Sequence, residues 1–230
     1  MRKFQKIASL LILLLLISSC EKKQTELEFE KSVMTEIFPS LIESTCIDSR
    51  VLFMRPPLGK PIYDKNDNYI GRDTSKIKVE RENWERAQFK IKNDTSKIIF
   101  AFDSKIKRNQ YNVKEDFEKH FSGAKIFESK KEQILEYEFD FKKIKFENRF
   151  VLKNISEFPK GKGEIWKTKY NFIFSGVVFF TRIQFDKDKK FGILDGGFAC
   201  GRLCGQGSRI YIKKINNKWV IDKIEETWVS

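Results

Sequence analysis

Apolar residues repeat at two different spacings along the chain, and these spacings predict where helices and strands lie. Between Thr25 and Thr45, the apolar positions from Val33 onward recur every three or four residues, as on one face of a helix. Pro39 lies inside this pattern and is expected to kink the helix or split it. We expect the apolar face of this helix to pack on a sheet.

Shorter stretches carry the alternating or aromatic-rich pattern of strands. Strands are predicted at 87–91, 97–102, 134–141 and 144–152, with a short helix at 113–121. Within 134–141, one face carries Tyr137, Phe139 and Phe141. A turn-rich run at 55–68 predicts an irregular loop with a short hairpin around Asn66-Asp67-Asn68.

The last quarter of the chain, residues 176–230, has the clearest pattern. It opens with an apolar run at 176–185, and half of the twelve glycines fall within 192–207. Clustered glycines between strand-like runs predict a tightly folded connection with bulges or turns. Asn216-Asn217 joins two β-branched runs at 209–215 and 218–224, which predicts a β-hairpin.

Together these elements predict an α+β fold with one domain at 27–230. The N-terminal helix should pack on one side of a twisted antiparallel sheet, and the chain should close with a β-hairpin. The 22 phenylalanines supply an aromatic core. By analogy only, this outline resembles the cone-shaped nuclear-transport-factor-2 fold, in which a helix packs on a curved sheet.

The N-terminus has the pattern of a secretory signal peptide over residues 1–19. A cationic stretch at 1–6 precedes an eleven-residue apolar core, Ile7 to Ile17, and a membrane-spanning helix needs about 20 residues. Ile17-Ser18-Ser19-Cys20 resembles the lipobox of bacterial lipoproteins, which implies cleavage before Cys20 and its lipidation. The alternative is an ordinary signal with an accidental cysteine. Residues 20–26 form a charged tether, and the cell envelope is the expected location, on its periplasmic face or cell surface.

The C-terminal block resembles a group of bacterial exported proteins without an assigned activity. The resemblance rests on Ser175-Gly176-Val177, Arg182-Ile183, Cys200-Gly201-Arg202-Leu203-Cys204-Gly205, Asn217-Lys218-Trp219 and Trp228-Val229-Ser230. It covers about the last sixty residues and implies no reaction.

The net charge of +13 falls to about +10 when Arg2, Lys3 and Lys6 leave with the signal. Such a charge attracts anionic surfaces. The lysines are spread along the chain, however, which favours a generally lysine-rich composition over a dedicated anion-binding patch. Because export makes nucleic acid an unsuitable partner, the expected partners are the membrane, reached through the lipid, and an acidic glycan or an envelope protein.

Three cysteines remain for the mature fold, and they permit the pairs 200–204, 46–200 and 46–204. Export favours oxidation. An extended segment would hold the Cα atoms of Cys200 and Cys204 about 13 Å apart, beyond the reach of a disulfide, so the chain must fold back there. We favour Cys200–Cys204, with Cys46 as a buried free thiol.

Signatures of catalysis are scarce, and no catalytic residue, metal site or cofactor is predicted. The only histidine, His120, lies at a predicted helix end, and the Asp64–Asn68 run lacks the later positions of a calcium loop. The two cysteines are separated by three residues, whereas thioredoxin-type motifs have two. Arg202 and Arg209 flank the glycine-rich segment, so an anion could bind among their guanidinium groups and the glycine amides.

The sequence therefore predicts a lipid-anchored cell-envelope protein with a non-enzymatic binding or accessory structural role. The alternative is a redox-active or hydrolytic envelope enzyme that uses the Cys200–Cys204 loop. An open polar pocket beside these cysteines would favour the enzyme, and a loop packed shut would favour the binding protein.

Overall fold

The computed structural model describes residues 24–230 except 53, 128–135 and 148. The predicted signal peptide, Cys20 and the start of the predicted tether lie outside these residues, as do Ile134 and Leu135 of one predicted strand and Asn148 of another. Helices and strands follow one another as α2 (Glu26–Thr45), α3 (Ser49–Leu52), β1 (Lys60–Tyr63), β2 (Tyr69–Asp73), α4 (Ile77–Lys92), β3 (Ile98–Phe102), β4 (Lys105–Lys107), α5 (Lys114–His120), β5 (Glu136–Glu138), β6 (Phe150–Asn154), α6 (Glu164–Lys167), β7 (Ile173–Phe180), β8 (Gln184–Phe185), β9 (Phe191–Gly201), β10 (Cys204–Ile215) and β11 (Lys218–Val229).

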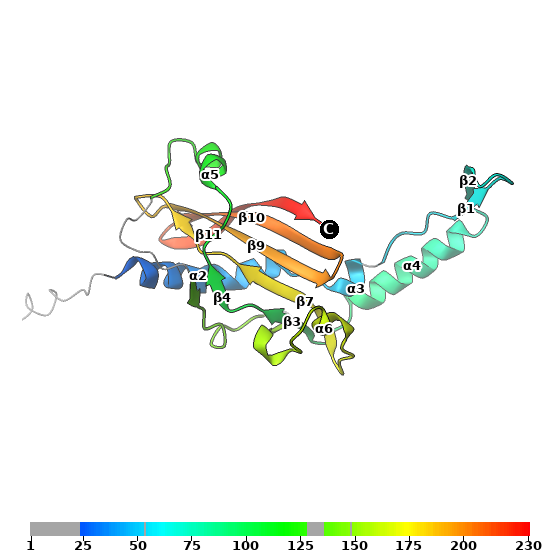
Figure 1. Cartoon of the computed structure of the whole chain (residues 1–230), viewed down its shortest axis with the longest axis horizontal. Coiled ribbons are helices and arrows are strands. Elements are labelled where there is room, and N and C mark those ends of the chain that lie inside the picture. Colours follow the sequence, from blue (N-terminus) through cyan, green and yellow to red (C-terminus); the bar gives the residue numbers. More distant parts are fainter. Residues whose placement is uncertain (1–23, 53, 128–135, 148) are drawn as a thin grey trace, which may run out of the picture.

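A mixed sheet forms the centre of the molecule (Figure 1). Its strand order is β11-β10-β9-β7-β3-β6, with β8 paired to β9. The prediction of an α+β fold is confirmed, but the prediction of an antiparallel sheet is wrong, because β3 pairs in parallel with both β6 and β7. All five residues of β3 are buried, as expected for a central strand covered on both faces.

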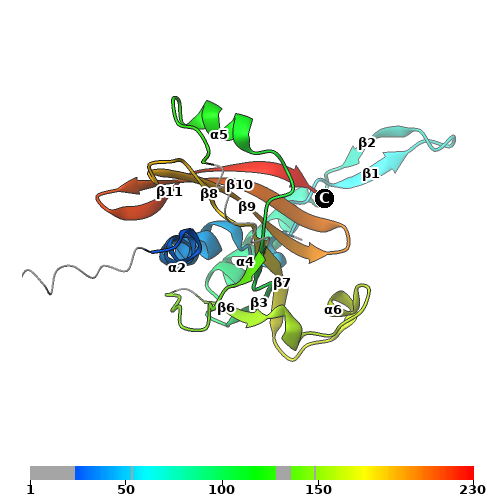
Figure 2. The ribbon, with the colours of Figure 1, turned by 60° about the vertical axis from the view of Figure 1, so that its left-hand side comes forward.

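Helix α2 packs on one face of the sheet, and α5 lies on the other (Figure 2). Thr25 caps α2 in a reciprocal pair with Glu28, so residues 25 and 26 of the expected tether belong to the helix cap and first turn. The helix continues through Pro39, so the predicted split does not occur. Buried apolar side chains of α2 share one core with inward-facing residues of the sheet, among them Phe100, Phe180 and Ile210.

A buried ion pair fixes α2 to the turn after β7. The Glu30 carboxylate is 2% exposed. It accepts hydrogen bonds from Arg182 Nε at 3.0 Å and from the backbone N–H of Ile183 at 3.0 Å. Burial of this kind requires that both charges be matched, so these residues define how the helix sits on the sheet.

Helix α4 and the β1–β2 hairpin extend from one end of the molecule, away from the sheet (Figure 1). The hairpin confirms the prediction around Asn66-Asp67-Asn68. The predicted strand at 87–91 is wrong, because these residues form the last turns of α4, none of whose side chains is buried. The predicted strand at 144–152 is only partly correct, since β6 begins at Phe150.

The glycine-rich segment is the largest correction to the predicted fold. The sequence predicts a tightly folded connection between strands at 192–207, but apart from the turn at Arg202-Leu203 these residues lie within two long paired strands, β9 and β10. Glycine is needed there because aromatic rings lie against the backbone. A Cβ atom at Gly196 would overlap the Phe180 ring on the helix face, and one at Gly197 would overlap the Phe179 ring. The predicted hairpin at Asn216-Asn217 is confirmed, and both asparagines have positive φ.

Candidate functional site

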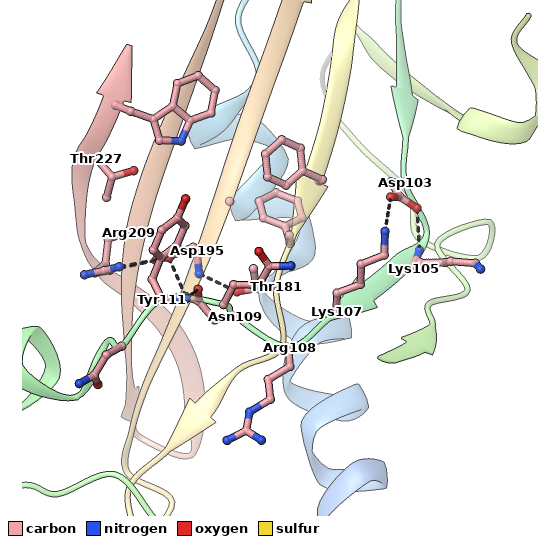
Figure 3. Close-up of a pocket in the computed structure, with 16 residues that line it drawn as sticks. Asp103, Lys105, Lys107, Arg108, Asn109, Tyr111, Thr181, Asp195, Arg209 and Thr227 are labelled. Atoms are coloured by element: carbon pink, nitrogen blue, oxygen red, sulfur yellow. Dashed lines mark hydrogen bonds and ion pairs between the residues drawn. The ribbon is translucent and has the colours of Figure 1, made fainter. Parts of the chain in front are cut away.

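A large cavity lies on the face of the sheet that carries α5, beside the loop between β4 and α5 (Figure 3). Its volume is about 960 Å³. The floor comes from β7, β9 and β10, and the walls come from β4, from the loop at 108–112 and from the end of β11. This cavity brings together segments that are far apart in the sequence.

A row of four residues paired across four strands supplies two of the aromatic rings that line the cavity, those of Phe179 and Trp228. Phe179 of β7 pairs with Gly197 of β9, Gly197 pairs with Gly207 of β10, and Gly207 pairs with Trp228 of β11. We call this set the aromatic–glycine row. The two rings lie against the two glycines, where a Cβ atom would overlap them. Because the glycines lack side chains, the rings can lie down on the sheet from both ends of the row.

A β-bulge positions the indole of Trp228. Gly207 pairs with Trp228, but Ser208 pairs with Glu226, so Thr227 is the extra residue of β11. Bulges re-aim side chains next to binding sites. Thr227 and Trp228 both line the cavity, and Trp228 remains 43% exposed. The indole therefore has one face against glycine and another available for a ligand.

A charged network holds the base of the cavity. The Arg209 guanidinium donates to Asp195 through Nε at 2.9 Å and through Nη2 at 3.2 Å, and Nη1 pairs with Asp116 of α5. Asn109 Nδ2 donates to Asp195 at 2.6 Å, which ties the loop to the sheet (Figure 3). Burial raises the pKa of the Asp195 carboxyl, and the hydrogen bond from Asn109 acts against that shift.

Cationic side chains line the outer edge of the cavity. Lys105 and Lys107 project from the exposed side of β4, while Ile106 between them is buried in the core. Their side chains are 53% and 56% exposed, and their closest carboxylates lie at 3.9 Å (Glu136) and 3.6 Å (Asp103). Arg108 is exposed beside them. We call Lys105, Lys107 and Arg108 the cationic rim.

The two arginines predicted to bind an anion do not converge. Arg202 is exposed in the turn between β9 and β10, whereas Arg209 lies five residues beyond Cys204 along β10. At about 3.3 Å per residue, the two positions are separated by well over 15 Å. Arg209 does line the main cavity, but its guanidinium is occupied by two carboxylates.

Cys200 and Cys204 lie at disulfide distance at the end of the β9–β10 hairpin, with Cα atoms 5.1 Å apart. The turn tip is open to solvent, and Leu203 is 80% exposed. A second cavity of about 250 Å³ adjoins this tip. Cys46 is a buried free cysteine, as predicted, and burial raises the pKa of its thiol.

Replacing both Cys200 and Cys204 by serine should lower the free energy of unfolding by about 2 kcal/mol, since the closed loop is short. Urea denaturation with and without dithiothreitol measures this. The reductant should cost the wild type the same amount and leave the double variant unchanged. A reductant effect of equal size in both proteins would show that this pair does not stabilise the fold.

His120, the only histidine of the chain, joins α5 to the sheet. Its ring stacks on Tyr211 at 4.0 Å between centroids, and Nε2 lies 2.8 Å from Asp222 Oδ2. Lys213 and His120 hold the pKa of the Asp222 carboxyl below its usual value, and burial together with Glu225 raises the pKa of Tyr211 to about 12. These contacts give His120 a packing role beneath α5.

In the described part of the chain, no group of three or more histidine, cysteine or acidic residues is placed to hold a metal ion. Asp64 is engaged in its own turn, where it accepts hydrogen bonds from the backbone N–H groups of Asn66 and Asn68. Within the same described ranges, no helix is both long and apolar enough to cross a membrane.

No known protein family, curated protein or solved structure matches this chain. The aromatic–glycine row and the cationic rim were not predicted as site residues. A signal for the rim was present in Lys105-Ile106-Lys107, whose alternation places both lysines on one side of a strand. The row had no comparable signal, because its four residues are brought together by the register of four strands.

Proposed function

We propose that this chain is a lipid-anchored cell-envelope protein with a non-enzymatic role, and that it binds its ligand in the large cavity. The supporting observation is the aromatic–glycine row, which brings two rings, Phe179 and Trp228, to the lining of a cavity of about 960 Å³. Ligand pockets combine apolar and aromatic walls with a few polar groups, and this cavity has that character.

The anchor in this proposal is the lipid on Cys20, which is expected from the lipobox. Helix α2 begins at Glu26, so only a short segment of chain separates the lipid on Cys20 from the folded domain. Several acyl chains are needed for firm attachment, because each buried methylene contributes only about 0.8 kcal/mol. The resemblance of the C-terminal block to exported proteins supports the same location in the cell envelope.

Cys20→Ala should abolish acylation. The protein should then accumulate as an unprocessed precursor or move from the membrane fraction to the soluble fraction. Labelled palmitate and intact-mass measurement of the purified protein would detect the change. Cys46→Ala is the matched control, since it removes another thiol and leaves the lipobox intact. Unchanged labelling of the Cys20→Ala protein would contradict the proposed anchor.

The alternative, an enzyme that uses the Cys200–Cys204 loop, has weaker support. The cavity beside this pair is small and is lined mainly by apolar residues, including Leu52, Phe198 and Val229. Among its described lining residues, Arg55 supplies the one ionisable side chain. The lining of this cavity favours a structural disulfide that closes the β9–β10 hairpin over a catalytic site.

The expected likeness to the nuclear-transport-factor-2 fold also stays a proposal. It is supported by the long helix α2, which packs on one face of the mixed sheet. The cavity proposed for binding lies on the other face, beside α5.

The test of the proposed function compares two forms of the natively anchored protein, the wild type and Trp228→Ala. The measurement is the material that each form captures from its own envelope. Material bound by the wild type should be lost from Trp228→Ala, because the indole is a wall of the cavity. Phe89→Ala, which removes a more exposed ring from α4, should retain it. Identical capture by the wild type and Trp228→Ala would exclude the cavity as the binding site.

A further inference from the structure

We infer that the cavity binds an acidic oligosaccharide, with sugar rings packed on Phe179 and Trp228 and carboxylates turned toward the cationic rim. The inference rests on the proposed function, since it names the ligand class of the same cavity. It follows from three features of the cavity: the paired rings, the charges that the fold leaves available, and the use of a sheet face instead of a sheet edge.

The paired rings give a platform longer than one ring. Phe179 and Trp228 stand at the two ends of the row, three strand spacings apart. With neighbouring strands about 4.8 Å apart, their backbones are separated by about 14 Å. Flat aromatic faces suit the apolar C–H faces of sugar rings, and two of them in line suit a chain of sugars.

A further aromatic side chain, Tyr111, stands on the loop above the sheet (Figure 3). Its backbone N–H donates to Asn109 Oδ1, and the Asn109 amide is in turn fixed to Asp195. Tyr111 is largely exposed although its loop is held in place. It can therefore cover a ligand that lies on the aromatic–glycine row.

The available charge is positive. Arg209 is already matched by Asp195 and Asp116, so it contributes little to the capture of an anion. Lys105 and Lys107 make only long, exposed contacts with single carboxylates, and such pairs are weak enough to be exchanged for a ligand. Arg108 forms no ion pair with any residue that the structure describes. The rim therefore selects a ligand with several negative charges.

An extended acidic peptide fits less well than an oligosaccharide. Peptides that join a sheet bind at an edge through main-chain hydrogen bonds. Here the floor is a sheet face, and the backbone groups of β9 are used by β7 and β10. Gln110 and Thr227 line the cavity, and neither side chain bonds to another described residue. Both are available to the hydroxyl groups of a sugar.

The experiment measures binding of three probes to the full-length protein in detergent. These are purified oligogalacturonate, its methyl ester, which keeps the sugar rings and loses the charges, and polyglutamate, which keeps the charges and has no sugar rings. Oligogalacturonate should bind, more weakly as salt rises, and the ester should bind at least tenfold more weakly. Trp228→Ala should weaken binding of oligogalacturonate about tenfold. A variant with Lys105→Gln and Lys107→Gln should weaken it about tenfold and reduce the difference between oligogalacturonate and its ester.

Matched controls are Phe89→Ala for the ring and Lys65→Gln with Lys78→Gln for the charge, since these exposed residues lie on α4 and the β1–β2 hairpin. Both controls should bind like the wild type. Circular dichroism verifies that each variant is folded, and the lysine variant keeps the test open if Trp228→Ala is not.

Several outcomes would overturn the inference. Equal affinity for the ester would remove the role of charge, and equal affinity for polyglutamate would remove the role of the rings. If oligogalacturonate does not bind while Trp228→Ala still loses the material captured from the envelope, the ligand class is wrong and the proposed function stands. If Trp228→Ala also captures the same material as the wild type, the ligand class and the proposed function are both contradicted.

Discussion

Replacing Glu30 by alanine is expected to lower the free energy of unfolding by about 3–5 kcal/mol. The substitution takes the carboxylate from a largely buried Arg182 guanidinium, and it leaves the Ile183 N–H without its acceptor. Both groups lie where α2 meets the turn after β7, so the helix loses one of its polar attachments to the sheet. Urea denaturation at neutral pH measures the change.

Two variants of the same helix separate the charge from the shape. Glu30→Gln keeps a hydrogen-bond acceptor of the same size and should lose less stability than alanine. Glu43→Ala removes an exposed carboxylate from α2 and should change the free energy of unfolding by no more than about 0.5 kcal/mol. A loss for Glu30→Ala as small as that for Glu43→Ala would show that the ion pair does not stabilise the fold.

Replacing Phe38 by alanine should also cost about 3–5 kcal/mol, because it opens a cavity in the main core. The ring is fully buried, and its centroid lies 4.8 Å from Phe139, 5.1 Å from Phe102 and 6.0 Å from Phe180. These partners come from β3, from the segment after β5 and from β7, so one ring joins α2 to three parts of the chain. Thermal and urea denaturation both report the loss.

Phe89→Ala is the control for this substitution. That ring is 69% exposed on α4, so its removal should change stability by less than about 0.5 kcal/mol. A loss below about 2 kcal/mol for Phe38→Ala would contradict the close packing of α2 on the sheet.

Sequence patterns predicted the elements whose signals are local. Helix α2 follows from its apolar face, and the Asn216-Asn217 hairpin follows from residues that tolerate positive φ. The strand predicted at 87–91 failed because five residues are too few to separate the two periods. Over the whole of α4, the less exposed positions 77, 80, 84, 87, 88 and 91 repeat at helical spacing.

Long-range pairing could not be predicted in the same way. β3 is parallel to β6 and β7, yet it is separated from them by the whole of 103–149 or more, and nothing local distinguishes its direction. From sequence alone, the glycines at 192–207 indicate turns, because their aromatic partners Phe179, Phe180 and Trp228 are identified only by strand register. The candidate site depends on that register, so its residues were recognised singly or not at all.

The disulfide hairpin has a consequence for oxidative folding. Cys200 and Cys204 are four residues apart, whereas Cys46 precedes them by more than 150. The entropy of closing the longer loop disfavours a Cys46 bond by about 3 kcal/mol on length alone. The short ring can close as soon as β9 and β10 meet, and Cys46 then becomes buried in the core at the C-terminal end of α2. The chain therefore reaches the Cys200–Cys204 disulfide without disulfide exchange, although Cys46 could in principle pair with either cysteine.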